Sequence, residues 1–297
     1  MSDFKIVTDS TSDLSQEMAE ELGVVVIPMN FTIGDDSFFD YPDEREISSH
    51  DFYTRLSAGQ TSTTNQISLE TFIETFEPVL QDGCDVLYLG FSSGLSGTYN
   101  NSVMAAKELS QKYPDRKIYA VDTRAASMGE GLLVWYAAQL QREGKTIEQV
   151  RDWEERNRLH MHHWFTVDDL NHLKRGGRIS GASALVGTML GIKPVLHFDD
   201  DGHILLVDKI RGRKQSLDDL TAHMQKTAED PGSQMIFIAS ADSAESSEYV
   251  KRKIESLFGT KRFAIGTIGP VIGAHSGPGT VALFFLGTDR EAGIEKK

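Results

Sequence analysis

The chain has 297 residues, a formal net charge of −14 and a single cysteine, Cys84. The strong negative charge argues against non-specific binding to nucleic acid or to an anionic membrane surface. One cysteine excludes an internal disulfide framework and is typical of a reducing compartment. No signal peptide is visible, and no apolar run approaches the roughly 18–20 residues that span a bilayer. We therefore expect a cytoplasmic protein without stable membrane insertion.

Strands and helices alternate through residues 1–160, which predicts an N-terminal domain with a doubly wound parallel sheet. Its predicted strands are 5–8, 24–27, 86–89 and 118–121. The predicted helices cover 13–22, with Asp13 as cap, and 51–56, 69–80, 100–109, 127–142 and 147–159. Ser68 and Thr146 are expected to cap two of these helices. A small edge hairpin is expected at 31–39 and an uncharged polar loop at 59–65.

Residues 161–297 predict a second α/β domain with a mixed or antiparallel sheet and helices. Predicted strands are 160–167, 194–198, 204–210, 235–239, 263–268 and 281–286, and predicted helices are 168–174, 182–190, 216–228 and 244–258. The strands at 194–198 and 204–210 are expected to pair as an antiparallel hairpin closed by Asp199–Gly202. A Gly-rich loop is expected at 269–279, and the domain boundary is placed near residue 160.

Hydroxyl-rich turns follow three predicted strands of the N-terminal sheet, at Asp9–Thr11, Ser92–Ser96 and Asp122–Thr123. The carboxyl ends of parallel strands share one edge of a sheet, so these turns are expected to gather there. The turn at Ser92–Ser96 also precedes a helix, whose N-terminus attracts negative charge. We therefore predict a site for an oxyanion, which can be a phosphate, a carboxylate or a tetrahedral intermediate.

One alternative is a serine hydrolase, because Gly90–Gly94 matches the nucleophile-elbow pattern G-x-S-x-G between a strand and a helix. Ser92 or Ser96 would be the nucleophile, and Asp122 and His275 follow in the order that such a triad requires. The match is short, and no HGGG-type segment for an oxyanion hole is present.

The sequence predicts neither a metal site nor a cofactor. His160 and His162 would share one face of a strand, which supplies two ligands but no third, so we interpret this segment as a polar edge or domain-junction strand. The turn Asp199–Gly202 lacks the pattern of a calcium loop. Gly273–Gly279 lacks the lysine of a phosphate-binding loop, and the basic cluster Lys209–Lys214 is typical of a solvated hairpin end.

A set of motifs along nearly the whole chain resembles the DegV family in order and spacing. They are Ile6–Leu14, Thr61-Ser62, Ser92–Tyr99, Leu173–Ile179, Ile192-Lys193-Pro194, Lys209-Ile210-Arg211 and Gly269–Gly279. The resemblance implies two α/β domains with a long-chain fatty acid buried between them. It also implies the binding subunit of a fatty acid kinase, which has no catalysis of its own. A separate ATP-binding kinase would phosphorylate the carboxylate that this subunit presents.

The resemblance also implies which residues act. Thr61, Ser96 and His275 would hold the carboxylate, with Ser62, Ser93 and Gly94 beside them in the same motifs, and Arg211 would face the kinase. One departure stands out: the family usually continues the Thr-Ser pair as Gln-Pro, whereas this chain has Thr63-Thr64. The loop therefore lacks a proline that would stiffen it.

The residue types agree with that assignment. A buried carboxylate needs several donors at once, and hydroxyls, backbone N–H groups and an imidazole supply them without a fixed positive charge. Each buried methylene contributes about 0.8 kcal/mol, so the acyl chain would supply most of the affinity. Residues that line such a cavity need only be apolar, so the sequence does not distinguish them from the core.

Overall fold

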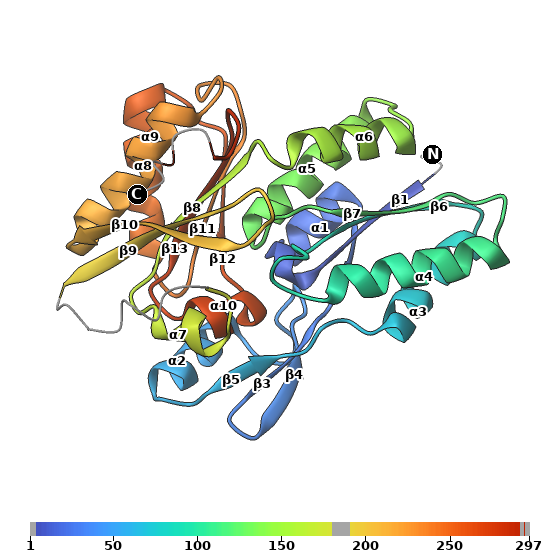
Figure 1. The fold of residues 1–297 in the computed structure, drawn as a ribbon, viewed down its shortest axis with the longest axis horizontal. Coiled ribbons are helices and arrows are strands. Elements are labelled where there is room, and N and C mark those ends of the chain that lie inside the picture. The colour runs from blue at the N-terminus through green and yellow to red at the C-terminus, as the bar shows by residue number, and fades with distance from the viewer. Residues whose placement is uncertain (1–3, 180–190, 292–293, 295–297) are drawn as a thin grey trace.

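The computed structural model describes residues 4–179, 191–291 and 294, and it contains two α/β halves that lie side by side (Figure 1). The predicted fold class is confirmed, because the first half has a parallel sheet and the second a mixed one. The predicted boundary near residue 160 falls in the connection between the halves and stays a prediction. The helix predicted at 182–190 lies outside the described residues.

The first sheet has the strand order β2-β1-β6-β7, and all its pairs are parallel. The bounds are β1 (Phe4–Asp9), β2 (Val25–Ile27), β6 (Asp85–Gly90) and β7 (Ile118–Asp122). The helices of this half are α1 (Gln16–Leu22), α2 (Ser49–Ser57), α3 (Leu69–Gln81), α4 (Thr98–Lys112), α5 (Met128–Arg142) and α6 (Ile147–Asn157). Helices cover both faces of the sheet, which explains why β6 is a continuous apolar run with no exposed side.

Helix caps were predictable at two of three positions. Ser68 accepts a hydrogen bond from the Thr71 N–H, and Thr146 forms a capping box with Gln149. The prediction that Asp13 caps α1 is wrong, because Asp13 adopts a left-handed conformation (φ 51°) that closes a 3-10 turn, η1 (Ser10–Ser12). Ser15 caps α1 instead.

A small antiparallel sheet lies below the two halves in Figure 1, with the order β4-β3-β5. Its strands are β3 (Asn30–Ile33), β4 (Asp36–Phe39) and β5 (Ser62–Thr64). The hairpin predicted at 31–39 is confirmed. The loop predicted at 59–65 is wrong in part, because its β-branched threonines pair as a strand with β3.

The second sheet has the order β10-β9-β8-β13-β11-β12 and is antiparallel except between β11 and β12. The bounds are β8 (Met161–Thr166), β9 (Ile192–Phe198), β10 (Ile204–Arg211), β11 (Ile236–Ser240), β12 (Phe263–Thr267) and β13 (Val281–Leu286). Its helices are α7 (Asn171–Arg175), α8 (Arg213–Thr227), α9 (Ala244–Phe258) and α10 (Pro270–Ser276).

Two predictions for this half need correction. Of the two interpretations of 160–163, the polar edge strand is wrong, because β8 lies between β9 and β13 and its His162 and His163 are buried, whereas the domain-junction strand stays a prediction. The segment 269–279 contains a helix, α10, which begins with a proline at a position that needs no N–H donor. His275 therefore lies in the last turn of a helix.

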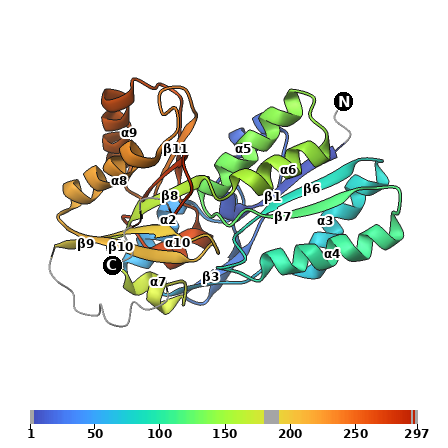
Figure 2. The ribbon, with the colours of Figure 1, turned by 45° about the horizontal axis from the view of Figure 1, so that its top comes forward.

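Helix α5 forms the layer between the two large sheets (Figures 1 and 2). It contacts β1 and β6 on one side and β8, β11 and β13 on the other. Glycines permit this close packing: a Cβ atom on Gly129 would lie 2.3 Å from His163 Nε2, and one on Gly131 would lie 2.6 Å from the Ser12 carbonyl oxygen. Helices α8 and α9 cover the opposite face of the second sheet.

Candidate functional site

A cavity of about 300 Å³ lies where the two halves meet, and both contribute to its wall. Most of the wall is apolar and includes Phe91, Phe165, Phe198, Ile204, Val271 and Phe284. Polar side chains from both halves also reach it, among them Thr64 on β5, Ser96 in the turn before α4, and Arg178 and His275 of the second half. The other polar residues of the wall are Asn65, Gln66, Ser127, His163, Ser276 and Thr280. The cavity therefore combines a mainly apolar surface with polar groups, as ligand sites do.

His275 is held on two sides. Its Nε2 lies 2.8 Å from the Thr64 hydroxyl, and its Nδ1 is buried with no hydrogen-bond partner in the structure. A Cβ atom on Gly176 would lie 2.2 Å from Nδ1, so only glycine fits there. Burial, reinforced by the positive charge of Arg178, lowers the pKa of the His275 imidazole to about 4. The ring is therefore neutral at pH 7 and carries one N–H.

Ser96 lies at the start of α4. Its Oγ accepts a hydrogen bond from the Thr98 N–H at 3.2 Å and lies 3.0 Å from the Thr98 hydroxyl. Gly97, the N-cap, makes no side-chain bond to this helix, and Ser96 takes up the first helical N–H, that of Thr98. Such a helix N-terminus stabilises a negative group.

Arg178 connects the Ser96 turn to the surroundings of His275. Its Nε donates to the Leu95 carbonyl oxygen at 3.2 Å, and its Nη1 donates to the carbonyl oxygen of Gly176. Arg178 thus brings a positive charge to the cavity wall, which was not expected from the sequence, and whether a bound carboxylate uses it stays a prediction. The sequence did not predict Arg178 as a residue of the cavity. The segment 175–178 has the features of a basic turn, and it also lies in one of the motifs that resemble the family.

Thr61 does not reach the cavity. It is exposed, while Ser62 and Thr63 hold β5 against β3: Ser62 Oγ donates to the Thr32 carbonyl oxygen at 2.6 Å, and the hydroxyls of Thr63 and Thr32 are 2.8 Å apart. These residues line a separate hollow of about 270 Å³, which shares Thr64, Arg178 and His275 with the cavity. The hydroxyl beside His275 thus comes from Thr64, three residues after the position that the motif indicated.

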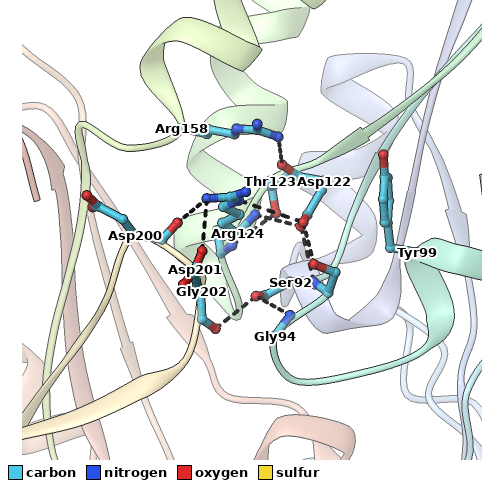
Figure 3. Close-up of polar contacts among 12 residues, drawn as sticks. Ser92, Gly94, Tyr99, Asp122, Thr123, Arg124, Arg158, Asp200, Asp201 and Gly202 are labelled. Carbon is cyan, nitrogen blue, oxygen red and sulfur yellow. Dashed lines mark hydrogen bonds and ion pairs between the residues drawn. The ribbon is translucent and has the colours of Figure 1, made fainter.

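Ser93 and Gly94 lie outside the cavity wall. Gly94 lies at a contact between the halves (Figure 3). Ser93 donates both its backbone N–H and its hydroxyl to Asp122. A Cβ atom on Gly94 would lie 2.7 Å from the Asp201 carbonyl oxygen, so the β9–β10 turn packs directly on the backbone of this glycine. Ser92 Oγ donates to the Gly202 carbonyl oxygen at 2.9 Å across the same contact.

Arginines complete this contact. Arg290, fully buried, donates to the carbonyl oxygens of Arg124 at 3.0 Å and Asp199 at 3.1 Å. Arg158 donates to the Asp122 carbonyl oxygen at 2.8 Å (Figure 3). The turn at Ser92–Gly94 therefore contacts the second half directly, whereas the turn at Asp122 reaches it through the backbone of Arg124.

The third hydroxyl-rich turn is also internally bonded. Thr11 Oγ1 lies within hydrogen-bond distance of the carboxyl groups of Asp9 and Glu130, and Tyr88 donates its hydroxyl to Asp9. Burial raises the pKa of both carboxyl groups, Asp9 and Glu130. Of the three turns expected to form an oxyanion site, only the one with Ser96 reaches the cavity.

This geometry disfavours a serine hydrolase. Ser92 is fully buried and donates to a backbone carbonyl, Asp122 accepts from Ser93, and the imidazole of His275 pairs with Thr64. The three groups of the triad with Ser92 are thus engaged with other partners, and Ser96, the alternative nucleophile, contacts Thr98.

Arg211 lies far along the hairpin, as the exposed last residue of β10. Within the described residues, no helix is long and apolar enough to cross a membrane.

The fold and the cavity define an α/β protein of two halves with a mainly apolar cavity between them. The chain belongs to the DegV family, described as uncharacterised proteins, whose model matches residues 3–288. A DegV domain-containing protein of Clostridium perfringens is 43% identical over 98% of this chain and 100% of its own length.

Solved structures are also similar. A DegV family protein of Thermus thermophilus, described with its fatty acid binding, has a TM-score of 0.85 and 32% identity over 97% of this chain and 100% of its own. DegV of Bacillus subtilis, described as a fatty acid binding protein, has a TM-score of 0.82 and 26% identity over 97% of this chain and 100% of its own.

Proposed function

We propose that this protein binds a long-chain fatty acid in the cavity between its halves. The observation that carries the proposal is the cavity itself: a mainly apolar space whose wall includes Thr64 and Ser96 of the first half and Arg178 and His275 of the second. Relatives of known structure are described as fatty acid binding proteins, which supports the same ligand class here.

The carboxylate would accept hydrogen bonds from the Thr64 and Ser96 hydroxyls and from His275, with Arg178 nearby. A carboxylate leaves water only when several donors replace its hydration, and these groups supply them. The acyl chain would lie among the phenylalanines of the wall, where about 0.8 kcal/mol per methylene gives most of the affinity. In this proposal Thr64, and not Thr61 as the family motif implies, donates a hydrogen bond to the carboxylate.

We further propose that the protein presents this carboxylate to a separate ATP-binding kinase and has no catalysis or cofactor of its own. The hollow beside His275 supports this arrangement, because it reaches the polar end of the cavity from the side of Thr61, Ser62 and Arg175. Arg211, exposed at the end of β10, would contact the kinase. Such a kinase would meet the protein in the cytoplasm.

Mass spectrometry of lipid released from the purified, denatured protein tests the ligand. We expect an intact long-chain fatty acid in close to equimolar amount. An empty protein that hydrolyses acyl esters, with activity lost in Ser92→Ala, would refute the proposal and restore the hydrolase.

Phosphorylation with the partner kinase tests the second part. Arg211→Ala should keep fatty acid affinity and lower the rate of acyl phosphate formation at least about tenfold, whereas the exposed Lys226→Ala on α8 should leave both unchanged. Equal rates for the two variants would show that the end of β10 does not contact the kinase.

A further inference from the structure

Asp208 on β10 and Asp219 and His223 on α8 bring three ligand atoms together on the side of the second sheet away from the cavity. One oxygen of each carboxylate and a nitrogen of the imidazole all lie within 4.8 Å of one another. His223 Nε2 lies 3.3 Å from Asp219 Oδ2 and 3.9 Å from Asp208 Oδ2. None of the three residues lines the fatty acid cavity.

The imidazole is fixed before any ligand arrives. The side chain of His223 is only 7% exposed, and its ring stacks on Trp164 with centroids 3.6 Å apart and an interplanar angle of 7°. Asp219 and His223 are four residues apart on one helix, so their side chains lie on the same face. The nitrogen is therefore held toward the carboxylates by packing.

A simple ion pair does not satisfy this cluster. Asp219 Oδ2 is buried and has no hydrogen-bond partner, although it lies 3.3 Å from His223 Nε2. The two atoms are thus close without the alignment that a hydrogen bond needs. A buried carboxylate oxygen without a donor is unfavourable, and a cation between the three groups would remove that cost.

We propose that Asp208, Asp219 and His223 bind a divalent transition-metal ion, with Zn²⁺ as the best match. Zinc binds nitrogen and carboxylate oxygen at about 2.0–2.2 Å, which places two ligands of one tetrahedral ion about 3.4 Å apart. The 3.3 Å distance between His223 and Asp219 fits, and Asp208, at 3.9 Å from the same nitrogen, would move about 0.5 Å closer on binding. The remaining coordination position is left for water.

The ion would link β10, the strand at the edge of the second sheet, to helix α8 by binding side chains of both. This position matters because the β9–β10 turn packs on Gly94 and receives the Ser92 hydrogen bond from the first half. The metal site therefore stabilises the hairpin that helps hold the two halves together. A mass-action gain in stability follows from any ion that binds only the folded protein.

Isothermal titration of the untagged, full chain with Zn²⁺ tests the proposal. We expect one saturable site, with affinity lowered at least about tenfold in Asp219→Asn and in Asp208→Asn. The matched control is His50→Ala, since His50 lies 3.3 Å from Asp242 in an exposed pair without a third ligand among the described residues. This variant should bind Zn²⁺ like the unchanged protein.

Trp164 supplies an independent readout, because it stacks directly on His223. Saturating Co²⁺ should quench part of the tryptophan fluorescence in the unchanged protein and in His50→Ala but not in Asp219→Asn. The proposal is overturned if no saturable site is found below about 1 mM Zn²⁺, or if both asparagine variants bind as tightly as the unchanged protein. Circular dichroism checks that each variant is folded. If Asp219→Asn does not fold, the Zn²⁺ affinity of Asp208→Asn alone tests the proposal.

Discussion

The hydroxyl of Thr64 offers the sharpest test of where the fatty acid carboxylate lies. Thr64→Val removes that hydroxyl and keeps the β-branched shape that β5 uses to pair with β3. Thr61→Val is the matched control, because Thr61 precedes the same strand, is exposed and does not line the cavity.

The expected size of the effect follows from the bond that is lost. A hydrogen bond to a charged group contributes about 1.5–3 kcal/mol, which corresponds to roughly 10- to 150-fold in affinity. The ligand-free protein also loses a contact, since Thr64 lies 2.8 Å from His275 Nε2. Because the substitution destabilises the ligand-free protein as well, the net loss of binding free energy is smaller. We therefore expect an affinity at the lower end of this range of losses, about tenfold weaker.

The assay is displacement of a fluorescent fatty acid from delipidated protein. Thr64→Val should weaken binding of a long-chain fatty acid about tenfold, and Thr61→Val should leave it unchanged. The methyl ester of the same acid has no carboxylate, so its weaker binding should be similar in all three proteins. The reasoning fails if Thr61→Val loses as much affinity as Thr64→Val, or if the ester and the acid respond equally.

Two further predictions concern stability. Gly94→Ala should lower the free energy of unfolding by about 1–3 kcal/mol in urea, because its Cβ would lie 2.7 Å from a backbone oxygen of the β9–β10 turn; an unchanged midpoint would show that this contact is not formed in solution. His275→Asn should flatten the pH dependence of stability without ligand. The unfolded chain takes up a proton on His275 below pH 6.5 and the folded protein only near pH 4, so stability falls as the pH drops through this window. At pH 5 the contribution of His275 to this loss of unfolding free energy is at most about 2 kcal/mol. If the free energy of unfolding changed equally between pH 7 and pH 5 in both proteins, the lowered pKa would be contradicted.

Most of the architecture was predictable from sequence because it depends on local signals. Alternating apolar runs and helical periodicity located the large strands and helices, and Ser68 and Thr146 marked helix starts by their cap chemistry. The errors lie where tertiary contacts decide. The threonines of β5 form a strand only because β3 is beside them, and the histidines of β8 are buried because α5 and α8 pack on the two faces of the sheet at this strand.

The site was predictable only in part. Ser96 and His275 were predicted and line the cavity, although their role stays a prediction. Thr64 and Arg178 were missed, because the register of β5 and the path of the turn after α7 are properties of the folded chain. The sequence predicted Ser92 and Ser93 to be part of the functional site. In the structure, Ser92 donates a hydrogen bond to the other half and Ser93 donates one within its own half. The cluster of Asp208, Asp219 and His223 was also not predicted. Asp208 lies on β10 and the other two residues on α8, and no sequence motif indicates that the strand and the helix bring them together.

A crystal structure of the protein with a bound long-chain fatty acid tests the central claim most directly. The account predicts the acyl chain in the cavity between the halves, with the carboxylate within about 3 Å of the Thr64 and Ser96 hydroxyls and of the His275 imidazole. A carboxylate bound at Thr61, or an acyl chain outside the cavity, would contradict it.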